Sequence, residues 1–285
     1  MHMPQHEQTS DRQAQATTLE VQYLRPMLEA LPAQWRSAVD VGAHRGDVTA
    51  FLTAIGYRVL AVEPHPAMAD RLEQRFADLI SNGGVRVARC AASERSGAEG
   101  DLFVGSATTV SSLEEEWTTR GFPEEFVDRR AVRVPLCRVD DLVGRLTDER
   151  LGFLKVDVEG HEYPVLQGCF SRGSMARPAV VMFEAFSRFP EAAGQCLEYL
   201  ARQGYGKFDI FVRVGAELCE IERFRRPELP DAWRERQGML FYANVIAYHP
   251  AATDSIATPD PAEFYHRYWR SSQSAASAPG KRHAA

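Results

Sequence analysis

Residues 38–64 read AVDVGAHRGDVTAFLTAIGYRVLAVEP, and their pattern indicates how the chain folds. An apolar run ends at Gly42, a short turn of small residues reaches Gly46, and apolar side chains then recur at helical spacing. A second apolar run, residues 58–62, ends at Glu63. The stretch therefore predicts a strand, a glycine turn, a helix and a second strand, which together form the βαβ unit that binds nucleosides in Rossmann-like sheets.

The spacing of the glycines separates the candidate ligands. Dinucleotide-binding turns read G-x-G-x-x-G, whereas here His44 takes the place of the second glycine, so the pyrophosphate cradle is incomplete. Asp40, just before the turn, would repel a pyrophosphate but attract an ammonium group. Glu63 follows the first glycine by about 20 residues, where a carboxylate accepts hydrogen bonds from ribose hydroxyls. These features favour S-adenosylmethionine; an ordinary turn in another α/β domain is the alternative.

The composition is that of a protein with a substantial core. The chain has 285 residues, 45% of them hydrophobic. A net charge of −6 and a pI near 5.8 argue against nucleic-acid binding. No apolar stretch reaches the roughly 20 residues of a membrane span, and residues 1–15 lack the apolar core of a signal peptide. We therefore expect a soluble, cytoplasmic protein with neither nucleic acid nor membrane as partner.

Cysteine spacing and the chain ends add two expectations. The five cysteines show no C-x-x-C spacing, which indicates neither a disulfide framework nor a zinc site, and most of them are expected as small buried side chains. Residues 1–17 and the Ser/Ala-rich tail after residue 272 are predicted to be disordered.

The remaining hydrophobic patterns predict a doubly wound α/β sheet of seven strands, mostly parallel, with the last strand antiparallel. After the two strands already placed, five more are expected at residues 85–91, 153–156, 179–183, 205–212 and 239–248.

Three segments lie outside this alternation of strands and helices. Residues 19–31 carry a helical apolar stripe that packs on the core, the favoured interpretation, or caps the ligand site. Residues 106–131 form either a surface loop with a capped helix or a lid over the substrate entrance. Residues 215–237 are charged and are predicted to be an exposed insertion with a short helix.

A second informative stretch, residues 153–168, reads FLKVDVEGHEYPVLQG. Strand-compatible residues lead into an acid-rich segment that precedes a predicted helix. This segment contains Asp157, Glu159, His161 and Glu162. The next buried run, residues 179–183, ends on Glu184. Because open α/β sheets bind ligands at the carboxyl ends of their strands, these side chains are predicted to share one edge of the sheet.

In this order the segments resemble the FkbM-type family of class I S-adenosylmethionine-dependent methyltransferases, over residues 37–248. The resemblance rests on VDVGAHRG, AVEP, CAASERSG, TTVSSL, VPLCRVDDL and FLKVDVEGHEYPVLQG, followed by a strand that ends on Glu184. It implies a Rossmann-like seven-stranded sheet, S-adenosylmethionine as cofactor, and methylation of a hydroxyl group on a small molecule such as a natural product or sugar. The cofactor-binding residues that it implies are Asp40, Gly42, Ala43, His44, Gly46, Glu63, Pro64, Ala92, Ser93 and Asp157.

No feature marks a second domain. We therefore expect one methyltransferase domain over residues 18–250, which includes the N-terminal helix and the insertion at 215–237. A C-terminal segment, residues 251–285, is expected to be partly disordered.

A hydroxyl acceptor has to lose a proton, so a base is expected near it. His161 is the first candidate because its reference pKa is about 6.5, and Glu159 or Glu184 would orient it or replace it. Each residue also has a simpler interpretation. His161 and Glu159 could cap the start of a helix, and Glu184 could pair with a Lys or Arg.

Other readings of the site remain open. A divalent metal held by some of Asp157, Glu159, His161 and Glu184 would lower the pKa of the acceptor directly, although metal-free chemistry is favoured. N-methylation would need no base, and a non-catalytic nucleoside-binding or dinucleotide-binding protein could share the fold. Residues 19–31 and 264–269 are candidate homodimer surfaces.

Overall fold

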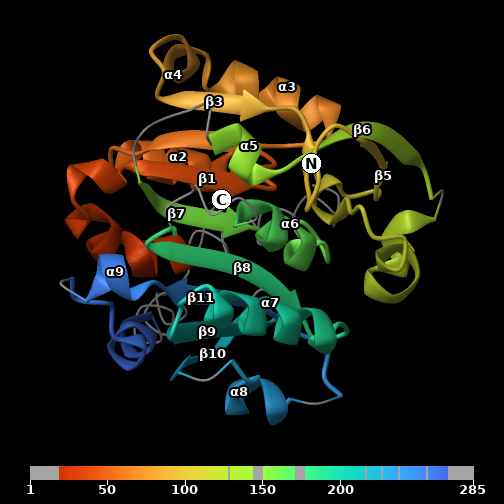
Figure 1. Ribbon diagram of the computed structural model, residues 1–285. Helices are drawn as coiled ribbons and strands as arrows, with labels where there is room; N and C mark the ends of the chain where they lie inside the picture. Colours follow the sequence, from red (N-terminus) through yellow and green to blue (C-terminus); the bar gives the residue numbers. More distant parts are fainter. Residues whose placement is uncertain are drawn as a thin grey trace, which may run out of the picture.

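The central sheet of the computed structural model has eight strands in the order β10-β9-β11-β8-β7-β1-β2-β3 (Figure 1). The structure describes residues 19–127, 129–143, 150–170, 177–215, 217–225, 227–236, 238–254 and 256–268. The two segments predicted to be disordered, residues 1–17 and the tail after 272, lie outside these ranges.

Five strands of this sheet are parallel and form its middle and one edge. The eight strands are β1 (Ser37–Val41), β2 (Arg58–Val62), β3 (Val85–Ala88), β7 (Leu151–Val156), β8 (Val180–Phe186), β9 (Lys207–Val214), β10 (Glu217–Phe224) and β11 (Tyr242–Tyr248). Strands β3, β2, β1, β7 and β8 pair in parallel, whereas β11 runs antiparallel between β8 and β9. The strand order reverses between β1 and β7, which is where open α/β sheets bind ligands.

The sheet has one strand more than the seven predicted. The additional strand, β10, lies within the segment 215–237 that was predicted to be an exposed insertion, and it pairs antiparallel with β9 at the edge of the sheet. A register shift between Leu218 and Glu220 interrupts its alternation of apolar and polar residues, and charged residues are typical of edge strands. The short helix predicted there is α8 (Asp231–Arg234), and the prediction that β11 is antiparallel is confirmed.

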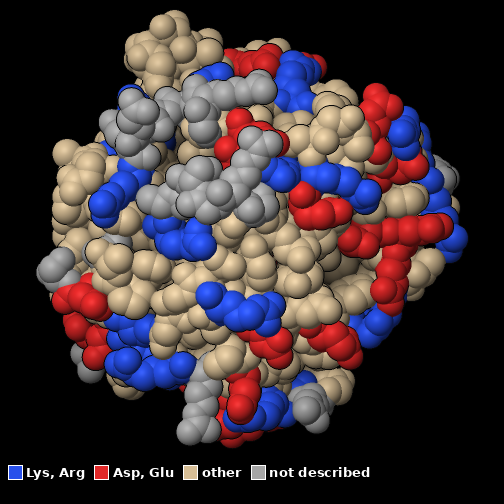
Figure 2. All heavy atoms as spheres, viewed as in Figure 1, with Lys and Arg blue, Asp and Glu red and all other residues tan. Residues whose placement is uncertain are grey.

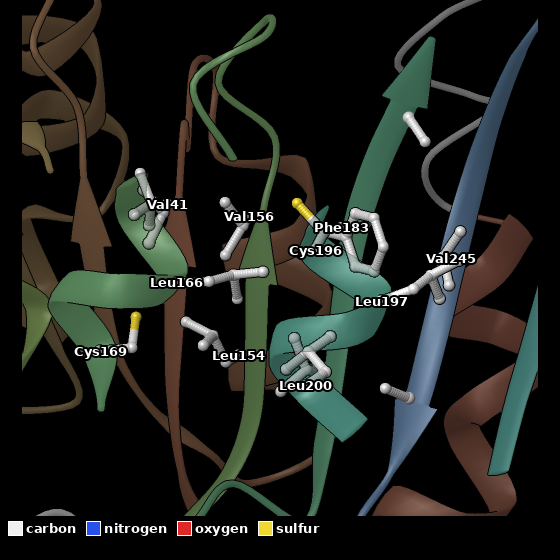
Figure 3. Packing of buried hydrophobic residues seen from close by; sticks show 14 of the residues in the cluster. Val41, Leu154, Val156, Leu166, Cys169, Phe183, Cys196, Leu197, Leu200 and Val245 are labelled. Carbon is white, nitrogen blue, oxygen red and sulfur yellow. The ribbon is translucent and has the colours of Figure 1, made fainter. Parts of the chain in front are cut away.

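Alternate residues of each strand point to opposite faces, so helices cover the sheet on both sides. Besides α8, the helices are residues 19–30, α2 (Asp47–Ala54), α3 (Pro66–Arg75), α4 (Ala77–Ser81), α5 (Val139–Val143), α6 (Glu162–Cys169), α7 (Pro190–Arg202), α9 (Pro250–Thr253) and residues 261–268. On one face, Leu166 of α6 and Leu197 of α7 point toward Leu154, Val156 and Phe183 of the sheet (Figure 3).

The helix of residues 19–30 packs on the opposite face. Its residues Val21, Leu24 and Leu28 are buried in one cluster with Phe153 and Val180, the strand neighbours of residues that face α6 and α7. This placement confirms that the apolar stripe of the helix serves packing on the core.

A small second sheet stands beside the carboxyl edge of the first. Its strands are β4 (Ala91–Ala92), β5 (Glu99–Phe103) and β6 (Ala131–Cys137), in the order β4-β6-β5. The strand predicted at 85–91 therefore ends at Ala88, because the chain leaves the central sheet and pairs with β6 from Ala91 onward. Cys90 and Cys137 form a disulfide at this junction, although the cysteine spacing indicated no disulfide framework. Their separation of 47 residues carries no recognisable spacing.

In the segment between β5 and β6, the described residues form short helical turns. They are η2 (Thr108–Val110), η3 (Trp117–Gly121) and η4 (Pro123–Phe126); a further turn, η1 (Ala33–Trp35), precedes β1. Trp117 is 2% exposed and stacks on Phe189 at 5.1 Å between ring centroids. An aromatic cluster thus fastens this segment to the start of α7, and the capped regular helix that the sequence suggested here is absent from residues 106–127.

On the face shown in Figure 2, acidic and basic side chains lie interspersed among other residues. Oppositely charged side chains also form ion pairs: the Arg89 guanidinium contacts both Asp70 and Glu73. Within the part of the chain that the structure describes, no helix is long and apolar enough to cross a membrane.

Candidate active site

The carboxyl ends of β1, β2, β7 and β8 open on one cavity, which the small sheet and the segment after β5 also line. Ten of the thirteen predicted site residues line this cavity: Gly42, Ala43, His44, Glu63, Pro64, Ala92, Asp157, Glu159, His161 and Glu184. The other three, Asp40, Gly46 and Ser93, lie behind its wall. Predicted cofactor residues and predicted catalytic residues therefore share one space.

The two glycines of the turn after β1 act differently. Gly42 has φ +73°, and a Cβ there would lie 1.8 Å from the carbonyl oxygen of Asp157, so the wall needs a residue without a side chain. Its N–H and that of Ala43 donate to the carbonyl of Val62, at 3.0 and 3.2 Å. Gly46 has φ +81°, but a Cβ there would collide with Phe76. Gly46 thus allows a helix to pack closely, whereas Gly42 shapes the cavity.

Glu63, at the end of β2, has its carboxylate held by main-chain N–H groups on both sides. Oε2 accepts from the N–H of His44 and Oε1 from the N–H of His65, each at 2.8 Å. The side chain is 5% exposed, and this burial raises the pKa of Glu63 to about 7, against the lowering effect of the two N–H donors. Each oxygen retains a lone pair, and Glu63 lines the cavity, which suits two hydroxyl donors on adjacent carbons.

Asp40 lies below the cavity floor and pairs with a cation that the sequence analysis missed. It is fully buried; its Oδ2 accepts from Thr49 Oγ1 at 2.7 Å, and its Oδ1 lies 3.5 Å from Lys155 Nζ. The structure thus places Asp40 against Lys155 and outside the cavity wall. An ammonium group of a ligand in the cavity would therefore not contact Asp40 directly. Lys155 also contacts Asp157 Oδ2 at 3.2 Å and donates to the Gly42 carbonyl at 3.0 Å.

Lys155 contacts both Asp40 of β1 and Asp157 after β7, and it is the one charged residue in the buried strand β7. Burial alone would lower the pKa of this amine, but Asp157 and Asp40 raise it above its usual range. A lysine inside an apolar strand was the sequence signal for this role, because a buried charge needs partners.

The end of β7 and the end of β8 bring three carboxylates together. One oxygen each of Asp157, Glu159 and Glu184 lies within 4.8 Å of the others. Burial, followed by repulsion from Asp157, raises the pKa values of Glu159 and Glu184 well above the usual range of a glutamate. We call these three residues the acidic lip.

Glu162 belongs to a different arrangement from its neighbours in sequence. Its Oε1 accepts from the N–H groups of Val158 and Gly160, at 3.1 and 3.2 Å, and thereby holds the turn that carries Glu159. Burial raises the pKa of Glu162 to about 7. This glutamate is a positioning residue for the acidic lip.

His161 stands before α6 but does not cap it, since its side chain makes no hydrogen bond to the helix start. Its Nδ1 lies 2.5 Å from Glu114 Oε1 and its Nε2 lies 3.0 Å from Ser93 Oγ. Ser93 in turn donates to Glu94 at 2.5 Å. Both ring nitrogens therefore have partners within the protein, and the imidazole ties the segment after β5 to the loop after β4.

Other lining residues also come from parts of the chain that the sequence analysis did not assign. The missed ones include Leu102, Thr109, Ser111, Leu113, Lys155 and Tyr242. Four of them belong to β5 and the segment after it, which agrees with the interpretation of residues 106–131 as a cover over the substrate entrance. Tyr242 begins β11 opposite Phe186 of β8, a place that only the antiparallel pairing of these two strands gives it.

The family comparison is specific, whereas the structural likenesses are distant. The model of the Methyltransferase FkbM domain matches residues 40–206. Methyltransferase FkbM from Methylobacillus flagellatus is 18% identical with a TM-score of 0.41, and the alignment covers 75% of this chain and 44% of that protein. A StiE O-MT fragment is 9% identical, with a TM-score of 0.44 and coverage of 90% and 80%.

Precorrin-6y C5,15-methyltransferase from Geobacter metallireducens is 10% identical, with a TM-score of 0.39 and coverage of 76% and 84%. The match to the Methylobacillus protein, at 44% of that protein, spans less than half of its length. No curated protein matches the chain. Because the family model covers more than half of the sequence, the chain belongs to the FkbM methyltransferase family.

Proposed function

We propose that this protein transfers a methyl group from S-adenosylmethionine to a hydroxyl group of a small molecule. The observation that carries the proposal is the cavity itself, which joins a nucleoside-binding end at Glu63 to carboxylates at Glu159 and Glu184. The first end suits the cofactor of the family, and the second suits an acceptor that must lose a proton.

The residues around the glycine turn fit S-adenosylmethionine. The bare backbone at Gly42 leaves space in the wall, Glu63 offers two acceptor oxygens for the ribose hydroxyls, and Ala92 provides an apolar surface for the adenine. Burial lowers the pKa of His44 to about 4, so this lining residue is neutral and does not repel a cationic ligand. We assign Asp157, which lines the cavity after β7, to the methionine end of the cofactor. When bound, S-adenosylmethionine supplies a methyl group on a positively charged sulfur, which a nucleophile can attack in line.

The acidic lip is the better candidate for the base. Glu159 and Glu184 line the cavity, and no hydrogen bond to either carboxylate occurs among the described residues. Both nitrogens of His161, by contrast, are held by Glu114 and Ser93. A carboxylate with a raised pKa takes up a proton more readily near neutral pH than an ordinary glutamate does. We therefore assign proton uptake to Glu184 or Glu159 and assign His161 a positioning role.

The decisive test is turnover of variants with an acceptor found by screening hydroxylated compounds with methyl-labelled cofactor. Glu184→Gln is expected to lower kcat by about 10²-fold to 10⁴-fold, because a positioned base contributes about that much, while affinity for S-adenosylhomocysteine changes little. His161→Gln should lower kcat less. Glu198→Gln, on the exposed side of α7, is the control with unchanged turnover.

Two outcomes would contradict this assignment. A larger loss in His161→Gln than in Glu184→Gln would return the role of base to the histidine. Labelling of amine acceptors alone, with no pH dependence from a base, would indicate N-methylation.

Cofactor affinity should increase with pH through about 7. The ribose hydroxyls need the anionic form of Glu63, and protonation below its raised pKa of about 7 removes one acceptor oxygen. Affinity for S-adenosylhomocysteine is therefore expected to be about tenfold weaker at pH 6 than at pH 8. The groups facing Glu63 are His44, His65, Lys155 and Asp40.

Calorimetric titrations of wild type and Glu63→Gln across this pH range test the expectation. The Glu63→Gln variant should bind more weakly at every pH and lose the step near pH 7. A step of equal size in both proteins would show that another group is responsible.

A further inference from the structure

The acidic lip brings three carboxyl groups together beside a single neighbouring cation among the described residues. Its three carboxylates come from the ends of β7 and β8, and one oxygen of each lies within 4.8 Å of the others. Among the described residues, the one cation in contact with them is Lys155, which touches Asp157 at 3.2 Å and shares its charge with Asp40. In this part of the chain, Glu159 and Glu184 are left without a cation of their own.

Glu159 provides an observation that is separate from this clustering. Its side chain is only 6% exposed and lines the cavity, yet no described group donates a hydrogen bond to its carboxylate. Its backbone carbonyl, by contrast, accepts from Ser112 Oγ at 2.6 Å. Burying a carboxylate without a donor is costly, and such groups in proteins are normally paired or bound to a metal. A partner for this carboxylate can reach it through the cavity, which Glu159 lines.

We propose that Asp157, Glu159 and Glu184 bind a divalent cation of the magnesium or manganese class, each through one carboxylate oxygen. Only oxygen atoms are offered, and hard divalent cations prefer oxygen ligands. A binding site of three carboxylates would also leave coordination positions for water or for an acceptor.

This inference rests on the proposed hydroxyl methylation and makes it more specific. A hydroxyl oxygen of the acceptor would occupy an open position on the cation, which lowers the pKa of that hydroxyl. Its proton would pass to the second oxygen of Glu184, the oxygen would attack the methyl carbon, and the electron pair of the broken carbon–sulfur bond would remain on sulfur. The substrate class would then be compounds with two neighbouring oxygen atoms that can chelate the cation.

Direct binding of Mn²⁺ tests the site without any acceptor. After treatment of the full chain with a chelator and its removal, Mn²⁺ is titrated and the free ion is followed by electron paramagnetic resonance. We expect one Mn²⁺ per chain, displaced by excess Mg²⁺. Glu159→Gln should weaken binding at least about tenfold, and Asp157→Asn should do the same. Glu198→Gln, a carboxylate change on the exposed side of α7, should leave binding unchanged.

Each result has a definite meaning, provided that the variants retain wild-type circular dichroism. No bound Mn²⁺ in the wild type, or binding unaffected by both lip variants, overturns the metal site. If the chelated protein still methylates a hydroxyl acceptor at the full rate, the metal inference fails and the proposed function stands. If S-adenosylhomocysteine does not bind although Mn²⁺ does, the proposed function fails and the metal site stands.

Discussion

Lys155→Met is expected to lower the free energy of unfolding by about 3 to 5 kcal/mol, the usual cost of removing one partner from a buried ion pair. Methionine keeps most of the volume, but Asp40 would then be fully buried with its Oδ1 lacking any cation. Urea unfolding at neutral pH measures the loss. Arg25→Met is the control, because Arg25 pairs with Glu29 on the surface and such pairs contribute less than about 1 kcal/mol.

A double variant isolates the cause of this effect. In Lys155→Met combined with Asp40→Asn, the buried charge of Asp40 is gone as well, so the loss should be smaller than the sum of the two single losses. A loss below about 1 kcal/mol in Lys155→Met alone would contradict the role of Lys155 as the partner of Asp40.

Gly42→Ala is expected to weaken S-adenosylhomocysteine binding by about 100-fold or more, equivalent to roughly 3 kcal/mol. The added Cβ would lie 1.8 Å from the Asp157 carbonyl, so the turn after β1 and the end of β7 must separate. Both of those segments line the cavity. Calorimetric titration measures the affinity, and thermal unfolding reports whether the variant remains folded.

Gly56→Ala is a matched control for the backbone strain. Gly56 has φ +87°, similar to +73° at Gly42, but nothing lies within 4 Å of its added Cβ. Both variants therefore carry the cost of a left-handed residue, about 1 to 2 kcal/mol, and only Gly42→Ala carries the collision. Equal affinities in the two variants would show that the close approach to Asp157 does not shape the cofactor site.

The sequence was informative where a local pattern carries the geometry. The glycine turn, Glu63 and the acids after β7 each follow an apolar run directly, and parallel strands bring such positions to one edge. Ten predicted residues consequently line one cavity. Asp40 and Ser93 are neighbours in sequence of residues at that edge, but neither lines the cavity. Strand alternation turns Asp40 toward Thr49, and a hydrogen bond turns Ser93 toward His161.

The features that were missed depend on contacts between distant parts of the chain. His161 meets Glu114 across 47 residues, so neither a cap nor a free base described its surroundings. Tyr242 reaches the cavity only through the pairing of β11 with β8. Strand β10 was hidden because its register shift breaks the alternation on which strand prediction depends.

The central claim is that the cavity binds S-adenosylmethionine, and calorimetric titration with S-adenosylhomocysteine tests it most directly, with NAD as the comparison. We predict micromolar binding of one S-adenosylhomocysteine per chain and no binding of NAD, since His44 replaces the second glycine of a dinucleotide turn. Binding of NAD, or of neither ligand, would contradict the account.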